Sequence, residues 1–256
     1  MAMPILELRK LTKRFGNLIA LREFDLDINQ GELIGVIGPN GSGKTTLFNL
    51  ISGYYRRFEG EIIYRGKRIS GLRSDQIARK GIARVFQSYV LYEDATVLEN
   101  ITRCFYLICK TNSWQSFFNT SRYCKEEVTQ RAEAEELLQP VGLAEFRDSL
   151  AGKLPYGYCR LLALAMALAT NPPLLLLDEP MAGISHEEKG LVINLIKKLG
   201  DQGITIMLVE HDVKAVVDIC PRLVVLDFGR KIADGSPEEV TTDRKVIEAY
   251  LGVEEG

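Results

Sequence analysis

A glycine-rich stretch at residues 38–46 has the residue types and the spacing that hold a chain of phosphates. It fits the pattern G-x-x-x-x-G-K-[ST], in which the glycines let the backbone turn tightly and point several N–H groups at one phosphate chain. Lys44 adds a positive charge for the β- and γ-phosphates, and the Thr45 hydroxyl can hold Mg²⁺. The residues predicted to contact the nucleotide are Gly38, Pro39, Asn40, Gly41, Ser42, Gly43, Lys44, Thr45 and Thr46.

An apolar run at residues 174–177 ends in an acidic pair, Asp178 and Glu179. One carboxylate where a buried strand ends can bind Mg²⁺ through water, and a second can orient or deprotonate an attacking water. Taken alone, the pair could equally be a strand end with solvated charges. Beside an intact phosphate-binding stretch, we predict that Asp178 binds the metal and that Glu179 acts on the water.

Two more polar residues follow predicted strands, namely Gln87 after residues 82–86 and His211 after residues 204–209. Either signal alone is weak, because a lone Gln is usually a polar loop residue and a His after a strand is often a surface or capping residue. Their order along the chain relative to the phosphate-binding stretch and the acidic pair makes both of them candidate site residues.

The phosphate-binding stretch lies between two elements that can position it. Residues 32–37 are typical of a buried strand, and residues 45–51 are typical of a helix whose positive N-terminal end faces the phosphates. Gly53 is a predicted helix stop, and residues 60–67 are typical of a hairpin.

The second half of the chain returns to buried strands, at residues 174–179 and 204–209. Ser185 and Glu188 form a capping box for the helix between these strands. Strands that alternate with helices predict an α/β fold with a mainly parallel sheet, and the polar, helical block at about 90–160 is then an insertion within that fold.

The composition of the 256 residues excludes several classes of protein. A formal net charge of −2 gives no broad footprint for nucleic acid. An odd number of cysteines without a CxxC pair, with two histidines, indicates neither a zinc site nor a disulfide framework. No signal peptide and no membrane-spanning run is expected, so work at a membrane would need a partner that spans it.

In the order of these motifs, the chain resembles the ATPase subunits of ATP-binding cassette transporters over nearly its whole length. Residues 38–46 match the Walker A loop, and residues 174–179 match Walker B with its glutamate. Gln87 matches the Q-loop, which the resemblance assigns to both the metal and the water, and His211 matches the switch histidine. Phe15 stands where the family stacks an aromatic ring on adenine, although alone it could equally be a core aromatic.

The resemblance implies a single ATPase domain at residues 1–252 with a P-loop NTPase, RecA-like core. The core is expected at about 1–88 and 161–252, with an antiparallel β subdomain, and a helical subdomain is expected at about 89–160. Two such cassettes, of the same or of different chains, would face each other head to tail around two Mg-ATP. Each ATP would touch the Walker A loop of one chain and the signature segment of the other.

The signature segment departs from the family pattern LSGGQ. It is formed here by Leu154, Pro155, Tyr156 and Gly157, followed by Tyr158. Pro155 removes a serine hydroxyl and a backbone N–H, although a proline fits the first turn of the following helix. The helix N-terminus and Gly157 can still face a phosphate, so we predict a weakened composite site.

Within the family, three features resemble the cassettes of branched-chain amino acid importers. They are Tyr156 with Gly157 in the signature, residues 180–184 in the D-loop that crosses between subunits, and the ending at residues 246–252. We therefore expect a peripheral subunit on the cytoplasmic face of the inner membrane that powers amino-acid transport. Its partners would be membrane-spanning permease subunits and an external solute-binding protein, with no nucleic acid.

Several alternatives remain open at this stage. Cassettes of lipopolysaccharide export share the D-loop and tail style, and urea and amide importers are close relatives. A mechanical ATPase acting on DNA or ribosomes can use the same cassette. An aromatic cluster contains Phe105, Tyr106, Trp114, Phe117 and Phe118. It could contact a partner, as could the loop around Tyr92 and Glu93, or it could pack inside the helical insertion.

Overall fold

The strand that leads into the phosphate-binding stretch lies inside a six-stranded sheet. β3 (Leu33–Ile37) pairs in parallel with β8 (Thr205–Val209) on one side and β9 (Arg222–Asp227) on the other. The other strands are β6 (Ile82–Val85), β7 (Leu174–Asp178), which is parallel to β8, and β10 (Arg230–Gly235), which is antiparallel to β9. The order is β10-β9-β3-β8-β7-β6, which confirms the predicted mainly parallel sheet.

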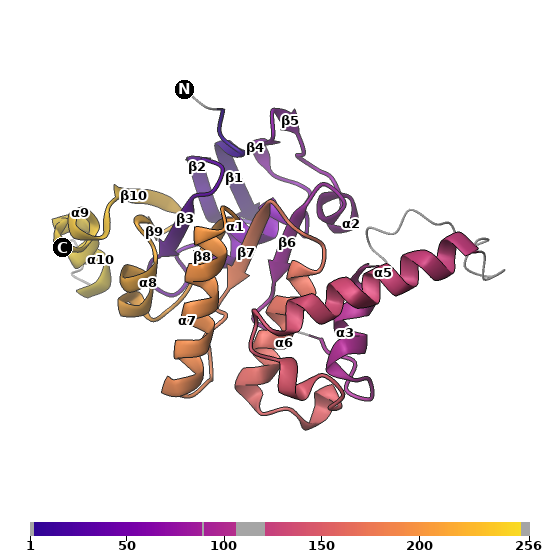
Figure 1. Cartoon of the computed structure of the whole chain (residues 1–256). Coiled ribbons are helices and arrows are strands. Elements are labelled where there is room, and N and C mark those ends of the chain that lie inside the picture. Colours follow the sequence, from indigo (N-terminus) through magenta and orange to yellow (C-terminus); the bar gives the residue numbers. More distant parts are fainter. Residues whose placement is uncertain (1–2, 89, 106–120, 252–256) are drawn as a thin grey trace. The chain divides into compact units, whose positions relative to one another are not determined.

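The computed structural model describes residues 3–88, 90–105 and 121–251 (Figure 1). These residues divide into two compact units. The first unit contains most of this sheet. It comprises the described residues up to Arg84, residues 173–179 and the described residues from 196 onward. The second contains residues from 85 to 172 and residues 180–195 within the described ranges.

A second sheet of the first unit is antiparallel, with the order β2-β1-β4-β5. Its strands are β1 (Leu6–Phe15), β2 (Leu18–Ile28), β4 (Glu59–Tyr64) and β5 (Lys67–Arg68). β4 and β5 form the hairpin expected from the sequence. This sheet confirms the antiparallel β subdomain that the family resemblance implied.

Burial explains why the central strands are continuously apolar. Every residue of β3, β7 and β8 is buried, as expected for parallel strands that are covered on both faces. Side chains of both sheets, such as Leu8, Phe24 and Leu176, share one core with the helix α1 (Lys44–Ile51), which contributes Leu47 and Phe48. The strands that lead to the phosphate-binding stretch and to the acidic pair are therefore held by a well-packed core.

The first unit also contains the helices α2 (Ser74–Ala78), α8 (Val213–Ile219), α9 (Pro237–Thr242) and α10 (Arg244–Leu251). α7 (His186–Asp201) begins in the second unit and ends in the first. Its capping box is confirmed, because the Ser185 N–H donates to Glu188 at 2.9 Å and the Glu188 N–H donates to Ser185 Oγ at 3.3 Å.

The second unit is helical. α3 (Val97–Cys104) packs against α5 (Ser121–Leu138) and α6 (Tyr156–Leu168), and short 3₁₀ turns lie at Ala144–Phe146 and Ala151–Lys153 (Figure 1). Ala134 and Leu138 of the predicted apolar stripe are buried. Phe105 of the predicted aromatic cluster is also buried, which favours internal packing at that position, and Tyr106, Trp114, Phe117 and Phe118 lie outside the described residues.

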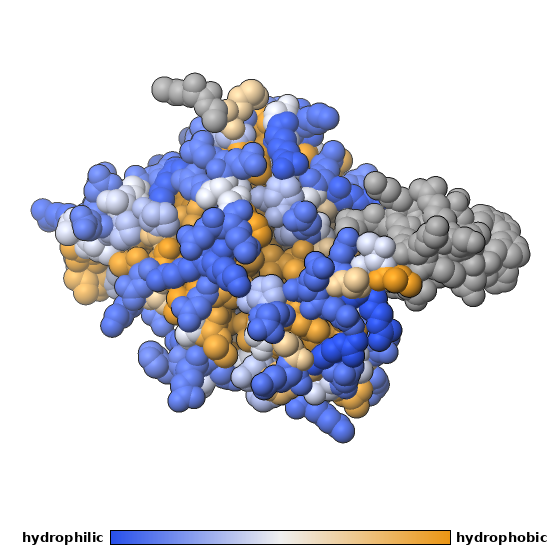
Figure 2. All heavy atoms as spheres, in the orientation of Figure 1, coloured by the Kyte–Doolittle hydropathy of each residue, from blue (hydrophilic) through white to orange (hydrophobic). Residues whose placement is uncertain are grey.

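Much of the face in Figure 2 is hydrophilic, with apolar side chains scattered between the charged ones. Apolar residues that are well exposed include Val90, Tyr92, Phe228 and Leu251. Among the helices of residues 3–88, 90–105 and 121–251, none has the length and hydrophobicity that a bilayer-spanning helix needs.

Candidate functional site

The phosphate-binding stretch turns on three glycines that no other residue type could replace without strain. Gly38, Gly41 and Gly43 have φ values of 151°, 80° and 109°, in the region that disfavours side chains. A Cβ added to Gly38 would lie 2.0 Å from the Leu226 carbonyl oxygen, and one added to Gly43 would lie 2.6 Å from the Ala20 carbonyl oxygen. Backbone conformation therefore requires glycine at all three positions, and lack of space requires it also at Gly38 and Gly43.

Lys44 is the first residue of α1, and its side chain folds back over this loop. Its ammonium Nζ donates to the carbonyl oxygens of Gly38 at 2.7 Å and Pro39 at 3.0 Å, and lies 3.4 Å from Ser42 Oγ. Burial lowers the pKa of Lys44, and the negative charges of Glu179 and Asp178 oppose part of that shift. Because its hydrogen-bond partners in the described residues are neutral oxygens, the buried cation is suited to an anionic ligand.

The N-terminus of α1 adds to this positive potential. In the described part of the chain, no side chain caps α1, and no acidic residue lies in its first turn. The uncapped N–H groups and the helix dipole both favour a phosphate here. The loop, Lys44 and the helix end therefore fit the triphosphate of a nucleotide.

Two contacts that brace this loop come from segments that sequence reasoning did not associate with it. The Ser42 carbonyl oxygen accepts a hydrogen bond of 2.9 Å from Gly229, in the turn between β9 and β10. Burial raises the pKa of the Tyr250 hydroxyl in α10, and a hydrogen bond from the backbone N–H of Gly38 opposes part of that rise. Both contacts tie the late part of the chain to the loop.

The acidic pair lies where the strand register predicts it. Asp178, the last residue of β7, pairs with Val209, the last residue of β8, so the residues after both strands meet at one edge of the sheet. The Glu179 N–H donates to the Val209 carbonyl oxygen at 2.9 Å, and Glu179 Oε1 lies 2.5 Å from His211 Nε2. The structure thus brings together Glu179 and His211, which are candidates from separate signals.

Glu179 has a backbone φ of 52°, which is rare for a residue with a side chain. Its side chain is 9% exposed, whereas that of His211 is 51% exposed. The strained backbone directs a buried carboxylate toward a histidine that solvent can reach. Strain of this kind persists only where the surrounding structure holds it, and it is common at functional sites.

Asp178 is held by a residue that the sequence did not single out. Arg84 Nη2 donates to Asp178 Oδ2 at 2.6 Å, and the two side chains are 5% and 6% exposed. Thr45, in the first turn of α1, is exposed. A hydroxyl and a carboxylate are oxygen ligands of the kind that Mg²⁺ prefers, so these residues fit the metal that the phosphate pattern implies.

The predicted adenine contact, Phe15, is not a core residue. The residue is 41% exposed, and its ring packs edge-on against Tyr55, with ring centroids 5.1 Å apart. Lys13 Nζ lies 4.7 Å from the centroid of the Phe15 ring. An exposed aromatic ring beside a cation can stack on a base, so the adenine role of Phe15 stays a prediction that the placement permits.

Gln87 and the signature segment belong to the second unit. Gln87 is an exposed residue, and its backbone carbonyl oxygen accepts a hydrogen bond of 2.6 Å from Nη1 of the buried Arg160. Arg160 Nη2 also donates to the Tyr156 hydroxyl and to the Ala182 carbonyl oxygen, each at 3.1 Å. Arg160 therefore joins three segments that the resemblance identifies, namely the Q-loop residue Gln87, the signature segment and the D-loop at residues 180–184.

The signature segment differs from expectation in two respects. Pro155 precedes α6 as its N-cap, with φ of −55° and ψ of 150°, rather than lying in its first turn. The Gly157 N–H, predicted to face a phosphate, donates to Glu188 Oε1 at 2.9 Å. Tyr158 packs against Phe146, with ring centroids 4.6 Å apart. An internal carboxylate thus occupies the helix end where the family resemblance places a phosphate.

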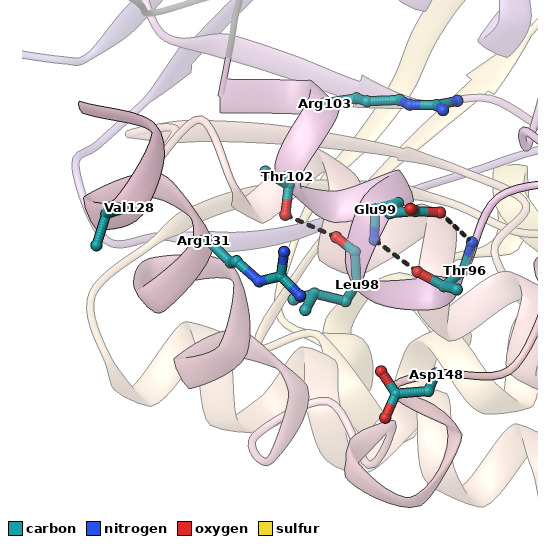
Figure 3. Close-up of a pocket in the computed structure, with 8 residues that line it drawn as sticks. All are labelled: Thr96, Leu98, Glu99, Thr102, Arg103, Val128, Arg131 and Asp148. Carbon is teal, nitrogen blue, oxygen red and sulfur yellow. Dashed lines mark hydrogen bonds between the residues drawn. The ribbon is translucent and has the colours of Figure 1, made fainter. Parts of the chain in front are cut away.

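The second unit also contains an open pocket of about 510 Å³ between α3, α5 and the segment around Asp148 (Figure 3). Its lining residues are Thr96, Leu98, Glu99, Thr102, Arg103, Val128, Arg131 and Asp148. None of them is a predicted site residue. Thr96 and Glu99 form the capping box of α3, and the Thr102 hydroxyl donates to the Leu98 carbonyl oxygen, so these three polar side chains stabilise the helix.

Comparison with known proteins agrees with these observations. Residues 21–182 match the family model described as ABC transporter, and residues 230–256 match the one described as branched-chain amino acid ATP-binding cassette transporter. The high-affinity branched-chain amino acid transport ATP-binding protein BraF of Pseudomonas aeruginosa is 39% identical over 253 residues. That alignment covers 98% of this chain and 99% of BraF.

Two solved structures are also similar. The ADP conformation of MJ1267, an ATP-binding cassette of an ABC transporter, has a TM-score of 0.84 at 32% identity and covers 98% of this chain and 100% of that chain. The dimeric post-hydrolysis state of the ATP-binding cassette MJ0796, bound to ADP and Pi, has a TM-score of 0.75 at 26% identity. It covers 91% of this chain and 98% of that chain.

Proposed function

Because this chain belongs to the ABC transporter family, we propose that it hydrolyses ATP to power the uptake of branched-chain amino acids through membrane-spanning partner subunits. The observation that carries the proposal is the buried Lys44 ammonium, bonded only to neutral oxygens in the described residues, within a glycine loop beside Asp178 and Glu179. The match of residues 230–256 to the branched-chain cassette family supports the class of solute.

Each residue of the first-unit site has a role in hydrolysis. The N–H groups of the loop and the Lys44 ammonium bind the β- and γ-phosphates and favour the charge that develops on them. The Glu179 carboxylate accepts the proton of the attacking water, and His211 holds Glu179 Oε1 in position at 2.5 Å. Mg²⁺, held by Thr45 and Asp178, would neutralise phosphate charge, and the assignment of Gln87 to the metal and the water rests on the family resemblance.

The chain is expected to work as one half of a pair of cassettes. The similar MJ0796 cassette was solved as a dimer, and ABC cassettes act with permease subunits. In a head-to-tail pair, the signature segment of this chain would serve the nucleotide on its partner's Walker A loop. The segment around Pro155 and Gly157 makes a self-pair less active than a pair with a cassette that has a fuller signature.

The rival functions receive less support. Lipopolysaccharide export and urea or amide import would each use a similar cassette, but the C-terminal match is to the branched-chain family. A mechanical ATPase on DNA or ribosomes is disfavoured by the transporter ATP-binding proteins among the relatives. We infer a place on the cytoplasmic face of the inner membrane, in contact with the permease and supplied by an external solute-binding protein.

Uptake by a reconstituted transporter tests this function. The chain is co-expressed with the permease and partner cassette of its own gene neighbourhood and placed in liposomes with ATP inside. Labelled leucine is then offered outside together with the solute-binding protein of the same gene neighbourhood. Leucine uptake that requires ATP and is competed by isoleucine or valine, but not by urea, is expected. A chain that remains in the soluble fraction with ribosomes or DNA, whatever permease is present, would refute the transport function.

A further inference from the structure

Arg84 connects two elements of the site from a buried position. Its Nη1 donates to Asn49 Oδ1 at 2.7 Å and to Ser52 Oγ at 2.8 Å, both from α1 or its C-terminal cap. Its Nη2 donates to Asp178 Oδ2 at 2.6 Å, at the end of β7. The guanidinium carbon also lies 5.7 Å from the centroid of the Phe48 ring. One planar group thus fixes the spacing between α1 and β7.

These two elements carry the two first-unit side chains assigned to the metal. α1 begins at Lys44 and bears Thr45, and β7 ends at Asp178. In the described part of the chain, Arg84 is the side chain that hydrogen-bonds the Asp178 carboxylate, and it does so through Oδ2. The bond therefore restrains the rotation of the carboxylate without using its other oxygen.

Arg84 also stands at a particular place in the chain. It lies in β6, is the last residue of the first unit before residue 85, and precedes Gln87 by three positions. A merely structural ion pair could lie anywhere in the core. This one links the strand that leads to Gln87 with the carboxylate and the helix of the metal site.

We propose that Arg84 is a positioning residue that sets the distance and orientation between the Asp178 carboxylate and helix α1, so that the two first-unit ligands of Mg²⁺, Thr45 and Asp178, are in place before nucleotide binds. The proposal rests on the proposed function, since that function assigns the metal to Thr45 and Asp178. Arg84 acts through Asp178 and α1 and is assigned no contact with the nucleotide or the reacting water.

Arg84→Lys is the sharpest variant, because it keeps the charge and so does not leave Asp178 as a buried, unpaired carboxylate. A lysine is a point charge without the planar fork, and it cannot bond Asp178, Asn49 and Ser52 at once in this geometry. Asn49→Ala is the second variant. It leaves the Arg84–Asp178 pair but removes one bond to α1, and it keeps the test available if Arg84→Lys folds poorly.

The measurement is the affinity of the chain for ATP by calorimetry, once with Mg²⁺ and once with EDTA. In the wild type, Mg²⁺ should tighten binding, and the ratio of the two dissociation constants measures that advantage. In Arg84→Lys the ratio should fall by about tenfold, the loss expected for one charge-assisted hydrogen bond, while the affinity in EDTA stays within about twofold. Asn49→Ala should reduce the ratio in the same direction by about threefold.

Arg222→Lys is the matched control, because Arg222 also forms a fork with Asp234 and a bond to Glu32 within the first unit. That variant should keep the wild-type ratio. An equal loss of affinity with and without Mg²⁺ in Arg84→Lys, an unchanged ratio, or the same fall in Arg222→Lys would overturn the positioning role. A wild type whose ATP affinity ignores Mg²⁺ would overturn the metal assignment of the proposed function as well.

Discussion

The N-termini of α1 and α6 are two helix ends expected to face phosphate, and they differ in what occupies them. At α1, the described residues supply no capping side chain, and Lys44 contributes a buried charge whose partners are neutral. At α6, the Gly157 N–H already donates to the Glu188 carboxylate, and a Cβ on Gly157 would lie 2.3 Å from that carboxylate. The N-terminus of α1 can therefore accept an anionic ligand, whereas the N-terminus of α6 already binds the Glu188 carboxylate of its own chain.

The difference shows that a helix dipole alone does not make a nucleotide contact. Glu188 also accepts from the Ser185 N–H, and these backbone hydrogen bonds, first from Ser185 and also from Gly157, hold its pKa below the ordinary range. Since a carboxylate at a helix N-terminus is favourable, the α6 end is stable without ligand. The phosphate of a nucleotide on the partner cassette's Walker A loop would have to displace the Glu188 carboxylate from this helix end.

Glu179→Gln should produce the largest effect, because it removes the proposed base of the first-unit site and leaves its phosphate contacts intact. Hydrolysis should fall by about 10²–10⁴-fold while ATP affinity is kept, since the amide preserves shape but cannot accept the proton. Steady-state phosphate release and calorimetry measure the two quantities. Glu187→Gln, an exposed change on α7, is the control. Turnover within a fewfold of wild type would assign the base elsewhere.

Lys44→Ala should have the second-largest effect, because the Lys44 charge is the main attraction for phosphate at the N-terminus of α1. ATP affinity should weaken by roughly 10–100-fold, the loss expected for hydrogen bonds to a charged group. Circular dichroism should show a folded protein, and Lys67→Ala in the short strand β5 should bind ATP normally. A folded Lys44→Ala with wild-type affinity would contradict the phosphate assignment.

Restoring the second helix end should have a smaller and opposite effect. Pro155→Ser with Tyr158→Gln should raise the ATPase rate of the isolated chain by about tenfold or less, because one serine hydroxyl and one N–H are returned to the signature segment. Thermal unfolding must be followed in parallel, since Tyr158 packs on Phe146. If the wild type is already fast and the double variant gains nothing, the signature of this chain is not weakened.

Glu188→Gln should give the smallest change and tests the comparison most directly. Glutamine can still accept from Ser185 and Gly157, but the negative charge at the α6 end is lost. ATP-dependent pairing should strengthen by about twofold to fivefold, the range of one charge near a helix terminus. Sedimentation with ATP in a hydrolysis-deficient Glu179→Gln background measures pairing. Unchanged pairing would mean that Glu188 does not oppose the partner's phosphate.

Local patterns explain what could be predicted from the sequence. The glycine loop could be predicted because positive φ values favour glycine at Gly38, Gly41 and Gly43, and close backbone contacts also leave no room for a side chain at Gly38 and Gly43. Continuous apolar runs identified the strands that end at Asp178 and Val209, and parallel pairing then places Glu179 beside His211. The family resemblance connected those signals, because neither histidine nor glutamate alone is informative.

The parts that were missed depend on contacts between distant residues. Arg84 in β6 gave no pattern that pointed to Asp178, which lies 94 positions later. Gly229 and Tyr250 brace the loop through a backbone bond and a hydroxyl, and neither residue type signals that partner. Glu188 was recognised as a helix cap, but its second bond, to Gly157, depends on how two segments pack.

The strand order has a consequence for the newly made chain. β3 carries the phosphate loop near the start of the sequence, yet its neighbours are β8 and β9, where Val36 pairs with Val209 and Ile37 with Val225. During synthesis, the phosphate loop leaves the ribosome long before β8 and β9 do. Without these neighbouring strands, the N–H groups of the loop have no fixed arrangement during most of synthesis. ATP can therefore stabilise the finished fold by mass action but cannot nucleate it, and nucleotide binding marks a chain whose C-terminal strands have been added.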